Sequence, residues 1–385
     1  MNSKLSLFVI FLRLGLTSFG GPVAHLGYFR DEFVSRRGWF SEQQYADNVA
    51  LCQLIPGPAS SQVGLLIGYQ RAGYLGALLA WLGFTLPSAA ALGYLGVSLA
   101  NPSTTLPPLL LLLLKVIAIA VVLQAVIGMA RNFCKTPTNR LLMIGCAIIL
   151  SLAASPWLTP ILILIAGTIS VTLDSARHSI RKLSVQLSLP SILWLAVFTG
   201  GLLTLPVLAS SGSQLIQLLD GFFRAGALVF GGGHVVLPLL ADATVARDLI
   251  SSDIFMSGYG AAQAVPGPLF TFAAFLGGAL NGDVSTAVLA TLAIFLPAVA
   301  LLFGVLPIWE QIKEHNTIRV AIAGANAAVV GVLLSALIGI SLETITSIYL
   351  ATGVVAVYVL IEKVKIPAWM LVLAATLLSM GASVI

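Results

Sequence analysis

Charged residues are scarce in this sequence. Only 9% of its 385 residues are charged, whereas 58% are hydrophobic, and soluble globular domains carry roughly a quarter charged residues. This number of charged residues is too small to cover a surface that faces water. We therefore expect most of the surface to face a lipid bilayer. The net charge of +5 is small and its basic residues are scattered over short loops, which is typical of membrane topology and not of nucleic-acid binding.

The sequence also contains few cysteines and none of the catalytic motifs that we searched for. The three cysteines, Cys52, Cys134 and Cys146, form no CxxC pair, which argues against a disulfide framework or a structural zinc site. We find no HExxH motif, no GxSxG elbow and no close pair of carboxylates within a hydrophobic element. The sequence therefore predicts no enzyme, no bound metal and no cofactor.

What the sequence does contain is an internal duplication. Phe11 to Gly15 and then Phe19-Gly20-Gly21 return about 210 residues later as Phe222 to Gly226 and Phe230-Gly231-Gly232. Three further anchors recur at the same displacement: Gln53 to Pro58 with Gln263 to Pro268, Leu86-Pro87 with Leu296-Pro297, and Ala125 to Gly128 with Ala336 to Gly339. We therefore expect an N-terminal repeat over 1–190, a connecting transmembrane helix over 191–210 and a C-terminal repeat over 211–385.

Hydrophobic elements follow one another along both repeats. We expect them near 5–37, 43–69, 74–100, 107–131, 140–153, 156–173, 191–209, 213–246, 253–280, 284–307, 318–340, 344–361 and 366–384. The first two elements of each half are interrupted by Gly-Gly or Pro-Gly-Pro, which break helices. A broken helix at membrane depth is tolerated only where it is buried in protein or lines a water-filled cavity.

The positions of the basic residues favour one topology. If the interrupted elements are re-entrant hairpins and the N-terminus is cytoplasmic, most of the 19 basic residues fall on the cytoplasmic side. Of the others, Arg247 falls outside, and Arg13, Lys115 and Arg224 lie within hydrophobic elements. The prediction is an all-α polytopic membrane protein of two inverted-topology repeats, with about nine crossings and four re-entrant hairpin elements, and with a periplasmic C-terminus.

Arg13 and Arg224 occupy matched positions in the two repeats. An arginine inside a membrane costs at least a few kcal/mol, and its guanidinium fork suits the oxygens of a tetrahedral anion. Two such residues at matched positions favour an anion path, although an arginine that snorkels to the interface is the alternative reading.

The glycine breaks bring further candidates. Helices that start after Gly20-Gly21 and Gly232-Gly233, near His25 and His234, would point free backbone N–H groups and a positive dipole end inward. Both histidines are candidates for proton coupling because imidazole titrates near neutral pH, and a purely structural role is equally open for each.

The two Pro-Gly-Pro breaks carry polar neighbours. Gln53 and Gln263 align, each three residues before the break, and Gly57 and Gly267 allow close backbone approach. Ser60 and Ser61 follow the first break only, so an asymmetric substrate site is predicted there.

Lys115 lies inside an apolar run, and its counterpart in the second repeat is Asn326. A buried lysine shifts its protonation readily, so Lys115 is a third candidate for proton coupling or anion binding. A lysine that snorkels to the interface is the alternative.

The motifs together resemble those of the chromate ion transporter family. Phe19 to Arg30 is similar to its N-terminal signature, and Gln53 to Pro58 and Trp81 to Ser88 are similar to the next two. Phe230 to His234 and Gln263 to Pro268 resemble the family's degenerate second repeat. The resemblance covers nearly the whole chain.

This resemblance implies a two-domain transporter of the bacterial inner membrane that exports chromate from the cytoplasm, driven by the proton gradient. Its partners would be chromate or a related oxyanion such as sulfate, protons and the lipid bilayer, and a homodimer is an open arrangement. A sulfate or other oxyanion transporter, and a passive anion channel of the same architecture, are the competing readings.

Overall fold

The structure, a computed structural model, describes residues 3–101, 107–153, 158–175, 187–229, 236–309 and 315–382. Within these ranges the secondary structure is helical and contains no strand, as the sequence predicts. Helices suit a lipid environment because each one satisfies its own backbone hydrogen bonds.

The first half contains seven helices among the described residues. They are α1 Ser3–Thr17, α2 Gly21–Arg30 with the π-helical turn Asp31–Arg36, α3 Glu42–Leu54, α4 Ala59–Leu99, α5 Pro108–Phe133, α6 Pro137–Leu152 and α7 Leu158–Ser175. Although α4 is 41 residues long, it bends sharply at Ala72 and Gly73, where Gly73 has a φ of +64°. It therefore comprises two segments. The second matches the element predicted near 74–100, and the first, together with α3, occupies the interrupted element predicted near 43–69.

The connecting helix and the second half follow the same order. The helices are α8 Leu189–Ala209, α9 Gln214–Leu228, α10 Val236–Thr244, α11 Ser252–Ala264, α12 Phe272–Asn281, α13 Val284–Val305, α15 Asn316–Thr344, α16 Ile348–Glu362 and α17 Ala368–Ala382. Short 3₁₀ turns occupy Val245–Arg247, Leu269–Thr271 and Leu306–Ile308. The predicted breaks at the glycine and proline motifs are present wherever the structure describes the chain.

Local chemistry explains where these helices begin and end. Gly20 caps α2 in the left-handed region with a φ of +99°, which glycine adopts without strain. Ser41 and Gln44 form a capping box at the start of α3, with Ser41 Oγ accepting from the Gln44 N–H at 3.2 Å. Pro56 and Pro58 cannot continue α3 because proline lacks the backbone donor.

Within the described residues, five helices are long and apolar enough to cross a membrane: those over 59–99, 108–133, 189–209, 284–308 and 316–344. Shorter apolar helices occupy 137–152, 158–173, 269–281, 348–362 and 368–381. The chain is thus a polytopic membrane protein. The number of crossings, the inverted orientation and the domain boundaries stay predictions.

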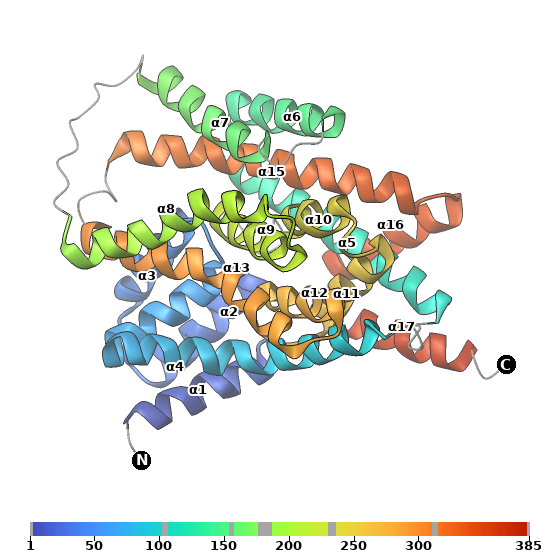
Figure 1. Cartoon of the computed structure of the whole chain (residues 1–385), viewed down its shortest axis with the longest axis horizontal. Coiled ribbons are helices and arrows are strands. Elements are labelled where there is room, and N and C mark those ends of the chain that lie inside the picture. The colour runs from blue at the N-terminus through green and yellow to red at the C-terminus, as the bar shows by residue number, and fades with distance from the viewer. Residues whose placement is uncertain are drawn as a thin grey trace.

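The two halves exchange their last helices. In Figure 1, α6 and α7 of the first half lie along α15 of the second half, and both pack against it. In the matching arrangement α16 and α17 of the second half pack against α5 of the first, while α5 and α15 contact each other. Equivalent helices therefore make equivalent contacts across the two halves.

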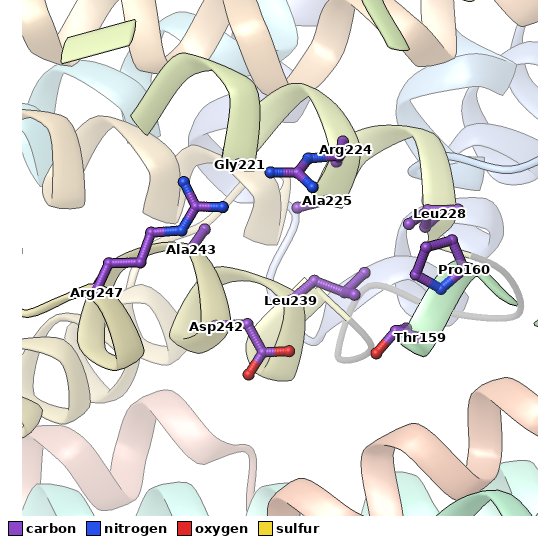
Figure 2. Close-up of a pocket in the computed structure, with 10 residues that line it drawn as sticks. All are labelled: Thr159, Pro160, Gly221, Arg224, Ala225, Leu228, Leu239, Asp242, Ala243 and Arg247. Atoms are coloured by element: carbon purple, nitrogen blue, oxygen red, sulfur yellow. The ribbon is translucent and has the colours of Figure 1, made fainter. Parts of the chain in front are cut away.

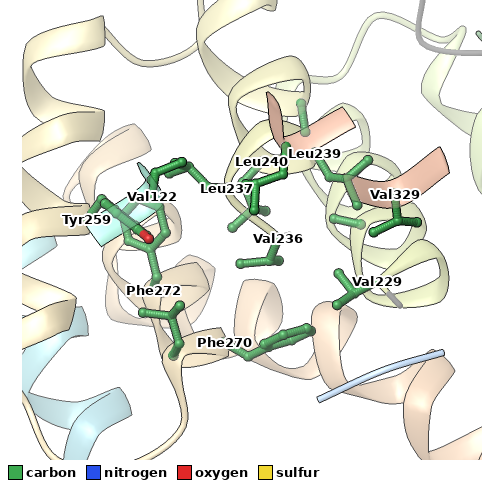
Figure 3. Packing of buried hydrophobic residues seen from close by; sticks show 14 of the residues in the cluster. Val122, Val229, Val236, Leu237, Leu239, Leu240, Tyr259, Phe270, Phe272 and Val329 are labelled. Atoms are coloured by element: carbon green, nitrogen blue, oxygen red, sulfur yellow. The ribbon is translucent and has the colours of Figure 1, made fainter. Parts of the chain in front are cut away.

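Two large apolar clusters hold the helices together, and each contains residues of both halves. One cluster gathers Phe11, Phe29, Phe33 and Phe84 around α1 to α4, with the Phe11 and Phe29 ring centroids 5.7 Å apart. The larger cluster lies among α9 to α13, α5 and α15, and Figure 3 shows its members Val229, Val236, Tyr259, Phe270 and Phe272, together with Val122 and Val329.

Candidate functional site

Two backbone hydrogen bonds join the breaks of one half to those of the other. The N–H of Gly267, in the second Pro-Gly-Pro, donates to the Ser18 carbonyl just before Gly20 at 3.0 Å. The N–H of Gly57, in the first Pro-Gly-Pro, donates to the Val229 carbonyl at 2.7 Å, and Val229 is the counterpart of Ser18. The breaks therefore meet in pairs across the two halves.

The backbone conformations of Gly57 and Gly267 require glycine at both positions. Gly57 has a φ of +129° and Gly267 a φ of +107°, which L side chains rarely adopt. A Cβ at Gly57 would lie 2.7 Å from the Ala298 Cβ, and one at Gly267 would lie 2.7 Å from Ser88 Oγ. No side chain fits at either position without a shift of its surroundings.

His25 and Ser60, both predicted site residues, come together beside this junction. His25 is 1% exposed, with Nε2 at 3.1 Å from the Ser18 carbonyl and Nδ1 at 3.3 Å from Ser60 Oγ. A carbonyl accepts only, so Nε2 carries a proton, and in the neutral ring Nδ1 accepts from the Ser60 hydroxyl. The ring also packs edge-on against Phe84 at a centroid distance of 5.2 Å. His25 thus connects the first glycine break to the residues after the first Pro-Gly-Pro.

Four buried polar atoms in the segments around Ser18, Ser60 and Phe84 lack a partner among the described residues. They are Ser18 Oγ, Ser61 Oγ, Gln62 Oε1 and Thr85 Oγ1, all in residues that are at most 3% exposed. Buried polar groups are nearly always hydrogen-bonded, so these four atoms are available to bind water or a polar ligand. Ser61 was predicted for the site, whereas Ser18 and Thr85 were not.

A cavity of about 210 Å³ opens at the junction of Gly20 and Gly21 with the second Pro-Gly-Pro. Gln263 and Gly267 line it as well, so it gathers four predicted site residues. The Gln263 Nε2 atom is buried without a hydrogen-bond partner among the described residues. The start of α2 and an unused amide donor therefore face one cavity, which is an arrangement that suits an anion.

Three further residues line this cavity that sequence reasoning missed: Gln124, Lys365 and Trp369. Lys365 has a φ of +65°, and its Nζ lies 3.9 Å from Glu362 Oε2. Gln124 donates to the same carboxylate at 3.0 Å. No repeat or motif marks these three positions, because Gln124 comes from α5, Lys365 from the connection between α16 and α17, and Trp369 from the start of α17. Only the exchange of helices brings these segments to the break.

Gln53 does not share the environment of its counterpart. Its side chain is exposed, whereas Gln263 is half-buried. The two glutamines therefore have different surroundings, and the cavity lies at the second Pro-Gly-Pro, whereas the additional hydroxyl groups follow the first.

Arg13 lies in an ion-pair network away from this cavity. Its guanidinium is 2.5 Å from Glu32 Oε2, and the buried Glu32 also accepts from Arg36 at 3.1 Å and from Arg37 at 2.6 Å. The Arg13 side chain is 49% exposed. The network agrees with the alternative reading in which Arg13 reaches towards an interface.

Arg224 is more buried, at 11% exposure, and donates to the 2% exposed carboxylate of Asp220. Arg247 Nη2 lies 3.8 Å from the same carboxylate. Figure 2 shows the Arg224 and Arg247 guanidinium groups beside each other, with Asp242 and Thr159 on the other side of a small cavity of about 30 Å³. The matched arginines thus each pair with a buried carboxylate, in separate places.

The remaining candidates fall elsewhere. Lys115 is 20% exposed and donates to Asp253, which is 60% exposed at the start of α11, a contact that is compatible with the snorkelling alternative. Gly232, Gly233 and His234 lie outside the described residues. No group of three His, Cys, Asp or Glu side chains that could hold a metal occurs in the part of the chain that the structure describes.

Comparison with known proteins agrees with the motifs. The family model described as chromate transporter matches residues 5–171 and 216–380. The chromate transport protein of Pseudomonas aeruginosa is 29% identical over 335 residues, which cover 85% of this chain and 78% of that protein. The chromate transport protein of Cupriavidus metallidurans is 28% identical over 393 residues, covering 98% and 92%. No solved structure matches the chain.

Proposed function

The chain belongs to the chromate transporter family, and we propose that it exports chromate from the bacterial cytoplasm by proton-coupled secondary transport. The observation that carries the proposal is the cavity of about 210 Å³ at the meeting point of the Gly20-Gly21 and second Pro-Gly-Pro breaks. Duplicated transporters commonly bind their substrate where broken helices of the two repeats meet.

The chemistry of this cavity suits a tetrahedral dianion. The start of α2 supplies backbone N–H groups and the positive end of a helix dipole. Gln263 supplies an amide donor without another partner in the described chain, and Lys365 supplies a positive charge at the cavity. Chromate and sulfate share charge and shape, so both fit this chemistry. A competition experiment between the two anions would rank them as substrates.

The mechanism we propose is rocking or gating of one repeat against the other around the bound anion. The Gly57–Val229 and Gly267–Ser18 hydrogen bonds would act as the contacts about which the two repeats move. His25 is the proposed proton-linked group, since a proton on Nδ1 would reverse its hydrogen bond with Ser60.

The predicted orientation is part of the proposal. Lys115 pairs with Asp253, which belongs to the periplasmic side in that topology, and Lys115 itself lies in the half of its hydrophobic element that is nearer to that side. Arg131 Nη1 lies 3.8 Å from Glu362, and both belong to the cytoplasmic side. Ion pairs join groups at one face, so both pairs agree with the sides that this topology assigns to their partners. The cytoplasmic N-terminus itself rests on the distribution of the basic residues.

Chromate uptake into proteoliposomes tests the function. We expect uptake that accelerates when a pH gradient is imposed and that sulfate reduces by competition. A chromate flux that does not depend on the pH gradient would indicate the passive channel instead. A chromate flux no greater than that of protein-free vesicles would contradict the proposal. Impermeant maleimide labelling of Ser252→Cys and Lys363→Cys in whole cells, on a background without native cysteines, tests the orientation, with labelling expected at position 252 only.

A further inference from the structure

A second cavity, of about 340 Å³, lies between the end of α5 and the start of α15. Its polar lining comes from Asn132, Lys135, Asn139, Arg319 and Asn326, and Leu54 also reaches it. None of the described lining residues is acidic. The described lining thus contains two cations, Lys135 and Arg319, and no carboxylate. We call this positively charged cavity the basin.

The helix geometry strengthens this positive potential. The cavity borders the first turns of α15, a helix of 29 residues without an acidic residue in its first turn. The positive end of a helix dipole disfavours a cation and favours an anion. Arg319 nevertheless stands there, so the dipole and the side-chain charge add instead of cancelling.

The basin is also lined by a buried polar group that has no hydrogen-bond partner among the described residues. Asn326 is 6% exposed, lines the cavity, and its Oδ1 has no hydrogen-bond partner among the described residues. The oxygen and nitrogen of an asparagine amide are assigned by their hydrogen bonds, so either end can serve a ligand or its water. A buried amide without a partner marks a place where a polar ligand completes the structure.

We propose that this basin binds a tetrahedral oxyanion group, held by Lys135 and Arg319 above Asn326. Leu54 ends α3 directly before Ile55 and the first Pro-Gly-Pro, so the basin is a loading site at the first break. The free substrate anion is one source of such a group. The phosphate of an anionic lipid is the other, since basic pockets between helices at the cytoplasmic side bind lipid head groups. The loading role rests on the proposed function, whereas binding of the oxyanion does not.

The test compares Lys135→Gln/Arg319→Gln with wild type and with Lys4→Gln/Lys363→Gln, which removes two exposed charges outside the basin. The shift in unfolding temperature on adding sodium sulfate to the purified protein measures binding without transport. Sulfate stabilises proteins in general, so the difference between variants is the readout. We expect a smaller shift in the basin variant than in wild type and the control.

Chromate transport in vesicles of phosphatidylcholine, with or without phosphatidylglycerol, then identifies the source. If free anion loads the basin, the basin variant raises KM about tenfold in both lipids, which corresponds to about 1.4 kcal/mol. If a head group binds there, phosphatidylglycerol activates wild type and the control but not the basin variant. Equal sulfate shifts, KM values and lipid responses in all three proteins overturn the inference. Absence of chromate transport by wild type, with the difference in sulfate shift retained, contradicts the proposed function alone.

Discussion

Gly57 and Gly267 are equivalent residues of the two halves, and each donates its backbone N–H to a carbonyl of the opposite half. The acceptors, Val229 at 2.7 Å and Ser18 at 3.0 Å, are themselves equivalent. Both glycines have positive φ values and no room for a Cβ. This reciprocal exchange brings helix ends from both halves to the candidate site.

Substitution of either glycine should disable transport. Gly267→Ala places a Cβ 2.7 Å from Ser88 Oγ in a backbone conformation that costs about 1–3 kcal/mol for an L residue. We expect chromate transport to fall at least tenfold, measured as initial uptake by proteoliposomes.

Gly128→Ala is the matched control. Gly128 lies inside α5, where an added Cβ would meet no neighbouring atom within 4 Å, and alanine favours a helix interior by about 1 kcal/mol over glycine. Its transport should stay within a factor of two of wild type, and equal losses in both variants would contradict the special role of Gly267.

The neighbouring serines should behave differently. Ser60 Oγ is bonded to His25, whereas Ser61 Oγ has no partner among the described residues. Ser60→Ala should lower the free energy of unfolding by about 1 kcal/mol through the lost hydrogen bond. Ser61→Ala should leave it nearly unchanged, and urea unfolding in detergent distinguishes the two. A larger loss in Ser61→Ala would refute the assigned hydrogen bond.

Lys365 should determine apparent substrate affinity. Lys365→Gln removes the positive charge that lines the cavity of about 210 Å³, and a hydrogen bond to a charged group contributes about 1.5–3 kcal/mol. We expect KM for chromate to rise about tenfold while the amount of inserted protein is unchanged. Lys363→Gln, two residues away, exposed and outside the cavity lining, should retain the wild-type KM; similar KM values in both variants argue against the site.

Arg224 and Arg13 should differ in their contribution to stability. Removal of Arg224 leaves the 2% exposed Asp220 without its hydrogen-bonded cation and with only Arg247 Nη2 at 3.8 Å, so the loss should be up to about 3–5 kcal/mol. Glu32 retains Arg36 and Arg37 when Arg13 is removed, and Arg13 is half exposed, so that loss should be about 1 kcal/mol or less. Thermal unfolding of Arg224→Gln and Arg13→Gln in detergent measures both; a larger drop for Arg13→Gln is the contrary result.

The helices themselves could be predicted from the sequence because hydrophobic length and the glycine and proline breaks are local signals. The element predicted near 107–131 is α5 at Pro108–Phe133, and that near 140–153 is α6 at Pro137–Leu152. The exchange of α6 and α7 with α16 and α17 could not be predicted, since it depends on which apolar faces fit together and not on any local pattern.

The site was predicted in part for the same reason. The breaks identify Gly20, Gly267 and Gln263, which do line one cavity. Matched position also pointed to Arg13, but its charge is engaged by Glu32, a contact that sequence spacing does not reveal. Lys365 became a candidate only through the three-dimensional arrangement, because no motif surrounds it.

Anomalous scattering from chromium in crystals of the protein grown with chromate tests the central claim most directly, because it locates the bound anion without assumptions about the site. The account predicts a chromium peak in the cavity between Gly20-Gly21 and Gly267, with a chromate oxygen within hydrogen-bonding distance of Gln263 Nε2. A chromium peak at Arg13 or Arg224, with that cavity empty, would contradict it.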